Sequence, residues 1–174
     1  MKRIIVIGVS AGVGKSTFAR MLGNILDIDV HHLDTFYWRP DWVEAPFEEF
    51  LAAQKEVLAH DKWIMEGNYS NSIDIRLKHA DTIFYLELPL RVCLYRVVKR
   101  RLINEGKTRP DMREGCVEKL DWAFIKFILT TYHSRKKKMK SRLVEIQRKE
   151  PGKVILILDS KQKIEGYFLN GRNE

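Results

Sequence analysis

Short apolar runs, rich in β-branched residues, alternate along the chain with longer segments of helical periodicity. The runs occupy residues 3–7, 28–33, 63–65, 82–88 and 154–158. Short, nearly continuous apolar runs are typical of strands that are buried on both faces of a parallel sheet. We therefore expect five strands, of which three lead into Gly8, Glu66 and Pro89.

The segments between these runs carry apolar residues at spacings of three and four, as helices do when one face is buried. The expected helices are Lys15 to about Leu26 with Ala19, Leu22 and Ile25 or Leu26 inside, Pro46 to His60 with Phe47, Phe50, Leu51, Val57 and Leu58 inside, Leu90–Ile103, a region ending near Lys149, and Ile164–Leu169. Strands that alternate with helices predict an α/β fold, here a five-stranded parallel sheet with helices on both faces. No repeat or linker divides residues 1–174, so one domain is expected.

Composition agrees with an ordinary globular domain, at 45% hydrophobic and 31% charged residues in 174. Cys93 and Cys116 are too few for a disulfide framework and have no metal-ligand spacing, which favours a reducing compartment. No apolar run is long enough to span a bilayer, and the run after Met1-Lys2-Arg3 is too short for a signal peptide. We therefore expect a cytoplasmic protein without a membrane partner, and the sequence leaves its oligomeric state open.

Positive charge is concentrated in one part of the chain. Residues 91–149 hold 18 Lys and Arg against 6 Asp and Glu, whereas the whole chain holds 31 against 23. A basic arm on a mildly acidic body indicates that the protein handles an anion, whether a triphosphate, a phosphorylated substrate or a nucleic acid.

A glycine-rich turn between the first strand and the first helix gives the most specific chemical signal. It reads Gly12-Val13-Gly14-Lys15-Ser16-Thr17. Backbone N–H groups of such a turn converge on phosphate oxygens, and the helix N-terminus adds its positive dipole end. The Lys15 side chain would reach the β- and γ-phosphates, and the Ser16 hydroxyl would ligate Mg²⁺. The turn therefore predicts ATP and Mg²⁺ as ligands, the alternative being a chance glycine turn that caps a helix.

The turn departs from the usual G-x-x-x-x-G-K-[ST] pattern at its first glycine. Counting back from Gly14 places Val9 at that position, and Gly8 stands one residue earlier. Either Val9 occupies the first glycine position or the loop is one residue longer than usual.

With the loop placed, the chain resembles the P-loop nucleotide and small-molecule kinases, such as adenylate, shikimate and gluconate kinases. Trp63-Ile-Met-Glu66-Gly67 is similar to the hhhDG segment of adenylate kinases, in which the acid lies beside magnesium, and this resemblance assigns Glu66 to the metal. The stretch after Pro89 resembles a segment with the pattern R-h-h-x-R-R, matched here from Arg96 to Arg101. In the family these arginines border the lid, which makes Arg96 and Arg100 catalytic candidates. The alternative is a solvated helix face.

More narrowly, the sequence is similar to proteins catalogued as DNA topology modulation proteins, a kinase-like group. His32-Leu-Asp34 followed by aromatics, Glu66-Gly-Asn-Tyr69, and Leu86-Glu-Leu-Pro89 with Cys93-Leu-Tyr-Arg96 carry this resemblance. That group's name describes a cellular effect and does not specify a reaction.

Three further features concern the second substrate. Asp34 follows the second strand, where an aspartate of shikimate-type kinases meets the substrate hydroxyl, so we assign it to catalysis and acceptor binding, the alternative being an Asx-turn. Arg76 is a candidate anion clamp on the acceptor, in place of a family arginine that is Ser70 here, or else a surface helix arginine. The aromatic group of Phe36, Tyr37, Trp38 and Trp42 suits either stacking on a ring-shaped acceptor or a small satellite core.

These observations predict a kinase that transfers the γ-phosphoryl group of ATP to a small-molecule or nucleotide acceptor. A basic lid is expected near residues 104–115, where Gly106, Pro110 and Gly115 suit a hinge. Two alternatives remain: a nucleic-acid-binding ATPase, suggested by the cluster Arg135-Lys-Lys-Lys138, and a nucleotide-binding regulator without transfer activity. The sequence presents no module that reads duplex DNA, so DNA binding is expected to be weak and non-specific.

Overall fold

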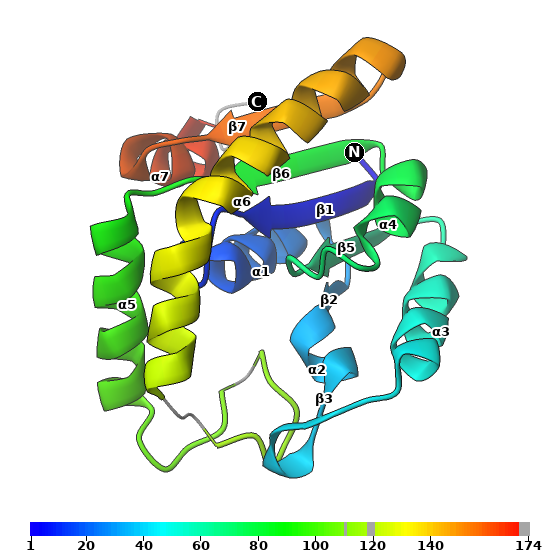
Figure 1. Ribbon diagram of the computed structural model, residues 1–174. Coiled ribbons are helices and arrows are strands. Elements are labelled where there is room, and N and C mark those ends of the chain that lie inside the picture. The colour runs from blue at the N-terminus through cyan, green and yellow to red at the C-terminus, as the bar shows by residue number, and fades with distance from the viewer. Residues whose placement is uncertain (110, 118–120, 171–174) are drawn as a thin grey trace.

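A single parallel sheet forms the centre of the structure, a computed structural model that describes residues 1–109, 111–117 and 121–170. The strand order is β2–β5–β1–β6–β7, and all neighbouring strands are parallel. The strands are β1 (Arg3–Gly8), β2 (Val30–His32), β5 (Trp63–Glu66), β6 (Thr82–Leu86) and β7 (Val154–Leu158). The predicted five-stranded α/β sheet is confirmed (Figure 1).

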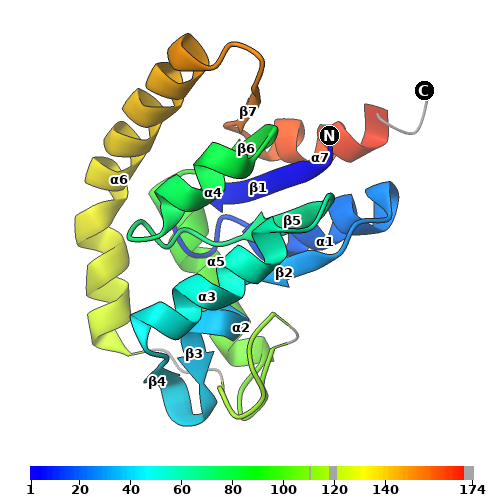
Figure 2. The same ribbon diagram turned by 90° about the vertical axis from the view of Figure 1, so that its right-hand side faces the viewer.

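Helices cover both faces of this sheet (Figures 1 and 2). They are α1 (Lys15–Leu26), α3 (Phe47–Leu58), α4 (Ile73–His79), α5 (Leu90–Ile103), α6 (Trp122–Lys149) and α7 (Lys161–Asn170). Adjacent residues of β6 point to opposite faces: the Phe84 ring packs on Phe18 of α1 and Tyr167 of α7, whereas the Tyr85 hydroxyl lies near Tyr132 of α6. This alternation explains why the central strands are apolar at every position.

Several short elements were not predicted from the sequence. Between β2 and α3 the chain forms α2 (Leu33–Tyr37) and an antiparallel hairpin of β3 (Trp38–Arg39) and β4 (Val43–Glu44), joined by a 3₁₀ turn (Pro40–Trp42). Helix α4 was also missed. These elements are too short for a hydrophobic period to be recognised.

The inner faces of two helices differ in detail from the expected pattern. Phe47 at the start of α3 is 41% exposed, whereas Gln54 is fully buried on that helix. The Gln54 Nε2 donates to the Phe50 carbonyl at 3.0 Å, whereas its Oε1 has no hydrogen-bond partner among the described residues. On α1 the buried residues are Phe18, Ala19, Leu22 and Gly23, and Ile25 is 52% exposed.

The register of the sheet brings the predicted site segments to one edge. His32 pairs with Glu66 at the ends of β2 and β5, and Gly8 pairs with Leu86 at the ends of β1 and β6. The phosphate loop, α2 and the segment after Glu66 all leave the sheet at these ends. Among the described residues, no helix combines the length and the apolar character needed to cross a bilayer.

Candidate active site

The phosphate loop joins Gly8 at the end of β1 to Lys15 at the start of α1. Gly12 and Gly14 have φ angles of 77° and 103°, which residues with a side chain rarely adopt. A Cβ on Gly12 would also lie 2.2 Å from the Cys93 carbonyl oxygen of α5. Both glycines are therefore required by the path of the backbone.

The departure at Val9 has a structural explanation. Val9 is buried, and its N–H donates to the Leu86 carbonyl at 2.9 Å, which continues the pairing of β1 with β6. At Gly8, by contrast, a Cβ would lie 2.6 Å from Cγ1 of the buried Val13. Because Val13 lies so close to Gly8, position 8 needs glycine. This favours a loop one residue longer than usual over a loop with Val9 in the first glycine position.

The N-terminus of α1 offers an anion site on three counts. No side chain caps it, and its first turn holds no acidic residue. The first-turn N–H groups of a helix have no intrahelical partner, and they carry the positive end of the dipole. Lys15 and Ser16 are partly buried beside these groups, and Thr17 is exposed one residue further on.

Glu66 at the end of β5 is the common partner of three polar groups. Its carboxylate accepts a hydrogen bond from Ser16 Oγ at 3.1 Å and lies 3.0 Å from His32 Nδ1 and 3.7 Å from Lys15 Nζ. Only 5% of its side chain is exposed. The phosphate loop and the end of β2 therefore meet at one buried carboxylate, and His32 belongs to this group although no role was predicted for it.

The segment from Glu66 to Tyr69 connects the phosphate loop with Asp34. Gly67 has a φ angle of 145°, and a Cβ there would lie 2.9 Å from Cβ of Leu33. The next residue, Asn68, accepts a hydrogen bond from the Gly8 N–H through Oδ1 at 2.9 Å. The Tyr69 hydroxyl then donates to Asp34 Oδ1 at 2.6 Å.

Asp34 lies in the first turn of α2 and is partly buried. Burial and the nearby negative charge of Glu66 raise the pKa of Asp34, while the Tyr69 hydrogen bond and the Lys15 charge act in the opposite direction. A carboxylate poised in this way can orient or deprotonate a hydroxyl. Its electrostatic coupling to Lys15 places it close to the phosphate loop.

Arg76 of α4 is fully buried, which contradicts the hypothesis that it clamps the acceptor. Its guanidinium donates to the backbone carbonyls of Gly67 and Tyr69, each at 2.9 Å. Burial lowers the pKa of Arg76 to about 10, so it stays charged at neutral pH. The role that these contacts support is to hold the segment containing Glu66 and Tyr69 in place, because one guanidinium links the carbonyls of Gly67 and Tyr69.

We predict that Arg76→Met lowers the free energy of unfolding by about 3 kcal/mol, because it removes two hydrogen bonds and takes the guanidinium donor from the buried Gly67 carbonyl. Urea unfolding followed by circular dichroism measures the change. Lys78→Met, on the exposed side of the same helix, is the matched control and should alter stability by less than about 0.5 kcal/mol. Equal stabilities of the two variants would contradict the structural role of Arg76.

Of the two lid-border arginines, Arg96 lies directly beside the phosphate loop. Its Nη1 donates to the Val13 carbonyl at 3.2 Å and would lie 3.3 Å from a Cβ on Gly14. Arg100 lies one turn further along α5 and is partly buried. Both therefore stand on the helix that packs against the loop.

The described part of the predicted lid lies over the same group of residues; residue 110 falls outside the described residues. Arg109 Nη1 donates to Asp111 Oδ2 at 2.8 Å, and both side chains are about nine-tenths buried. Burial alone would raise the pKa of Asp111, but the Arg109 charge and the nearby Ser16 hydroxyl outweigh it and lower that pKa. The Arg109 charge also acts to lower the pKa of Asp34, against the larger effects of burial and Glu66, which raise it. No role was predicted for Asp111 from the sequence, in which it is one of several charged residues between Gly106 and Gly115.

Beyond Asp111 the lid docks on the β3–β4 hairpin. The Asp41 N–H donates to the Gly115 carbonyl at 3.2 Å, and Trp42 Nε1 donates to the Val117 carbonyl at 2.8 Å. The Cys116 thiol donates to the Arg39 carbonyl at 3.2 Å. The lid thus bridges the phosphate loop on one side and the segment next to Asp34 on the other.

Comparison with known proteins agrees with this fold. No family model and no curated protein sequence matches the chain. A solved shikimate kinase from Bacteroides thetaiotaomicron matches with a TM-score of 0.57 and 15% identity over 99% of this chain and 97% of that chain. A deoxyadenosine kinase from M. mycoides, with bound dATP, matches with a TM-score of 0.52 and 14% identity over 98% and 99%. The chain has the P-loop kinase fold.

Within the P-loop kinase fold, three members of the aromatic group next to Asp34 pack against one another and against Phe50 and Tyr69. The Tyr37 ring lies 5.0 Å from Trp38, 5.2 Å from Phe50 and 4.8 Å from Tyr69, and Trp38 lies 5.4 Å from Trp42. These contacts favour a satellite core over a surface that stacks on the acceptor. The core supports Tyr69, which donates to Asp34, and helix α2, which carries Asp34.

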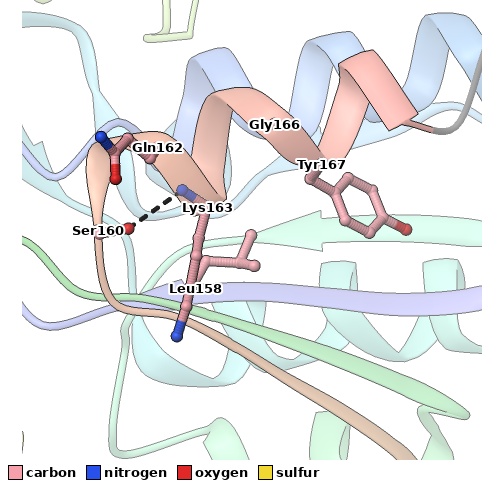
Figure 3. A pocket seen from close by; sticks show the side chains of 6 residues that line it. All are labelled: Leu158, Ser160, Gln162, Lys163, Gly166 and Tyr167. Atoms are coloured by element: carbon pink, nitrogen blue, oxygen red, sulfur yellow. Dashed lines mark hydrogen bonds between the residues drawn. The ribbon is translucent and has the colours of Figure 1, made fainter.

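A shallow hollow also opens at the end of β7, at the same edge of the P-loop kinase fold. Figure 3 shows its lining, which is Leu158, Ser160, Gln162, Lys163, Gly166 and Tyr167. The Lys163 N–H donates to Ser160 Oγ at 3.1 Å, which caps the start of α7. The six lining residues do not include Lys15, Asp34 or Glu66, so the hollow is separate from the candidate active site.

Proposed function

We propose that the protein binds ATP with Mg²⁺ at the phosphate loop and transfers the γ-phosphoryl group to a small-molecule or nucleotide acceptor held at Asp34. The observation that carries this proposal is the convergence of Lys15, Ser16 and Asp34 around the buried Glu66 carboxylate. A phosphate-binding group and a candidate base that lie this close suit transfer between two bound substrates.

The residues around Ser16 fit a magnesium site. The Ser16 hydroxyl and the Glu66 carboxylate lie 3.1 Å apart, and both supply the oxygen ligands that Mg²⁺ prefers. When bound, the metal would neutralise charge on the phosphates. We assign Ser16 as its direct ligand and Glu66 as the carboxylate that holds the metal's water.

The cations around the loop would stabilise the charge of the transferring phosphoryl group. Lys15 is the residue of the loop that reaches the β- and γ-phosphates, and the backbone N–H groups of residues 12–17 hold the rest of the triphosphate. Arg96 and Arg100 would add charge from α5, and the lid would exclude water. Asp34 would orient the acceptor hydroxyl and accept its proton.

A metabolite screen tests the proposed function directly. The protein is incubated with ATP, Mg²⁺ and a panel of hydroxyl-bearing metabolites and nucleosides, and mass spectrometry detects products heavier by one phosphoryl group. We expect at least one acceptor to be phosphorylated, with no product when the Lys15→Ala variant is used. ATP binding without any product across the panel would favour a nucleotide-binding regulator instead.

The resemblance to DNA topology modulation proteins keeps a nucleic-acid-binding ATPase as the second candidate. The cluster 135–138 that suggests it is divided in the structure. Lys136 pairs with Glu87 at 2.7 Å and Arg135 lies over the Phe127 ring, while Lys137 and Lys138 are exposed. We propose that the protein acts on small molecules in the cytoplasm, where its two buried free cysteines suit a reducing medium.

We predict that Arg100→Ala damages ATP turnover while barely altering DNA affinity, and that replacing Lys137 and Lys138 by Gln does the reverse. Each exposed lysine that contacts a phosphate should contribute about one unit to the slope of the logarithm of DNA affinity against the logarithm of salt concentration. Turnover assays and fluorescence anisotropy with duplex DNA at several salt concentrations measure both effects. Sequence-specific, salt-tolerant DNA binding by the wild type would contradict the small-molecule assignment.

A further inference from the structure

The hydroxyl of Tyr69 makes a short hydrogen bond to the carboxylate proposed as the base. Tyr69 Oη donates to Asp34 Oδ1 at 2.6 Å, although the two residues are 35 positions apart in the chain. Burial and the negative charge of Asp34 raise the pKa of Tyr69 far above its ordinary value, so the hydroxyl keeps its proton. Tyr69 is therefore a permanent donor to Asp34.

The Tyr69 ring and backbone are fixed independently of Asp34. The ring packs against Tyr37 and Phe50, with centroids 4.8 Å and 4.9 Å away. Its backbone carbonyl accepts from Nη2 of the buried Arg76 at 2.9 Å, and the same guanidinium holds the Gly67 carbonyl. A donor that is held from both sides can impose an orientation on the flexible carboxylate.

Asp34 needs such a donor because its other surroundings act against its charge. Burial and the Glu66 carboxylate at the end of β5 favour the protonated form. The groups that favour the charged form are Tyr69, Lys15 at the start of α1 and Arg109 of the lid. Of these three, Tyr69 makes the hydrogen bond to Asp34. Lys15 and Arg109 are cations that a bound triphosphate would attract, whereas Tyr69 is neutral.

We propose that Tyr69 is a positioning residue for phosphoryl transfer: its hydroxyl occupies Asp34 Oδ1, so that Oδ2 faces the hydroxyl of the acceptor. This inference rests on the proposed function and adds to it the residue that aims the base. Arg76 acts one step further away, since it anchors the segment that carries Tyr69. The Glu66-Gly67-Asn68-Tyr69 segment then serves both substrates, with Glu66 and Asn68 on the phosphate loop and Tyr69 on Asp34.

The test uses Tyr69→Phe in the full-length protein, a change that removes one oxygen and keeps the packed ring. The Asp34 carboxyl carbon is followed by NMR as pH is varied, and we expect its titration midpoint to rise. Tyr37→Phe is the matched control, because Tyr37 belongs to the same aromatic cluster but its hydroxyl lies near Glu44, whereas Asp34 accepts from Tyr69. In the control the Asp34 midpoint should not change.

Kinetics give a second readout once an acceptor is known. For Tyr69→Phe we expect kcat to fall about tenfold, as for the loss of one hydrogen bond to a charged group, with KM for ATP unchanged. The acidic limb of the kcat profile should move to higher pH, because protonated Asp34 persists further. A purely structural role would lower the melting temperature and leave that limb in place.

The outcomes separate this inference from the proposed function. An unchanged Asp34 midpoint and an unchanged pH profile in Tyr69→Phe would overturn the positioning role, even if Lys15→Ala abolishes turnover. A shifted midpoint supports the hydrogen bond even if no acceptor is found. If Tyr69→Phe fails to fold, the Cζ resonance of Tyr69 is compared between the wild type and Asp34→Ala, which removes the acceptor, and no difference would overturn the proposed bond.

Discussion

Replacing Lys15 with alanine is expected to lower ATP turnover by about 100-fold or more, the usual cost of losing one preorganised charge partner of a transition state. Lys15 is the first residue of α1, where the phosphate loop ends, and its ammonium lies 3.7 Å from the Glu66 carboxylate. With the ammonium removed, the β- and γ-phosphates lose their nearest fixed cation. Steady-state turnover with ATP and Mg²⁺, together with calorimetric ATP titration, measures the effect.

Arg20→Ala provides the control, since Arg20 is exposed on the same helix and carries the same charge. Its turnover should equal that of the wild type. Circular dichroism should show an intact fold for both variants. Only about an eighth of the Lys15 side chain is exposed, but its ammonium is paired with Glu66 and is not part of the apolar core. Wild-type turnover and ATP affinity in Lys15→Ala would remove the basis for the phosphate-loop assignment.

Asp34→Asn is expected to lower turnover by about 100-fold while changing ATP affinity little, because general base catalysis contributes factors of this size and Asp34 is the residue proposed to face the acceptor. Asparagine keeps the shape of the side chain and can still accept from Tyr69, so the loss reports the charge. Rates at saturating ATP and the dissociation constant of ATP separate the two effects.

The matched variant is Asp29→Asn, which removes an exposed carboxylate just before β2, at the other end of the strand that leads to Asp34. It should leave turnover unchanged. Normal turnover in Asp34→Asn would return Asp34 to the Asx-turn alternative, and a large loss of ATP affinity would assign it to the nucleotide.

The sequence predicted the phosphate loop and the sheet because both depend on local patterns. Gly12, Gly14, Lys15 and Ser16 are contiguous, so their chemistry follows from a few neighbouring residues and the helix that they begin. The strands are short apolar runs whose burial follows from hydrophobicity alone. The first residues of α1 and α5 also follow from local sequence, because Gly14 and Pro89 directly precede these helices.

Arg76 illustrates what a local pattern cannot reveal. An arginine in a short helix is usually solvated, and nothing nearby in the sequence indicates full burial. The burial arises because the segment after β5 turns back over α4 and presents the carbonyls of Gly67 and Tyr69 to the guanidinium. Only the path of that segment decides between a substrate clamp and a structural anchor.

Local patterns in the sequence thus predict the fold class, the phosphate loop and the strand ends at which Asp34 and Glu66 stand. They do not predict that Tyr69 donates to Asp34 or that Ser16 donates to Glu66, which the folded structure shows. The physical reason is that strand order and loop paths, which depend on packing over the whole chain, set the direction of each side chain. Contacts between residues dozens of positions apart follow from those directions and leave no periodic trace in the sequence.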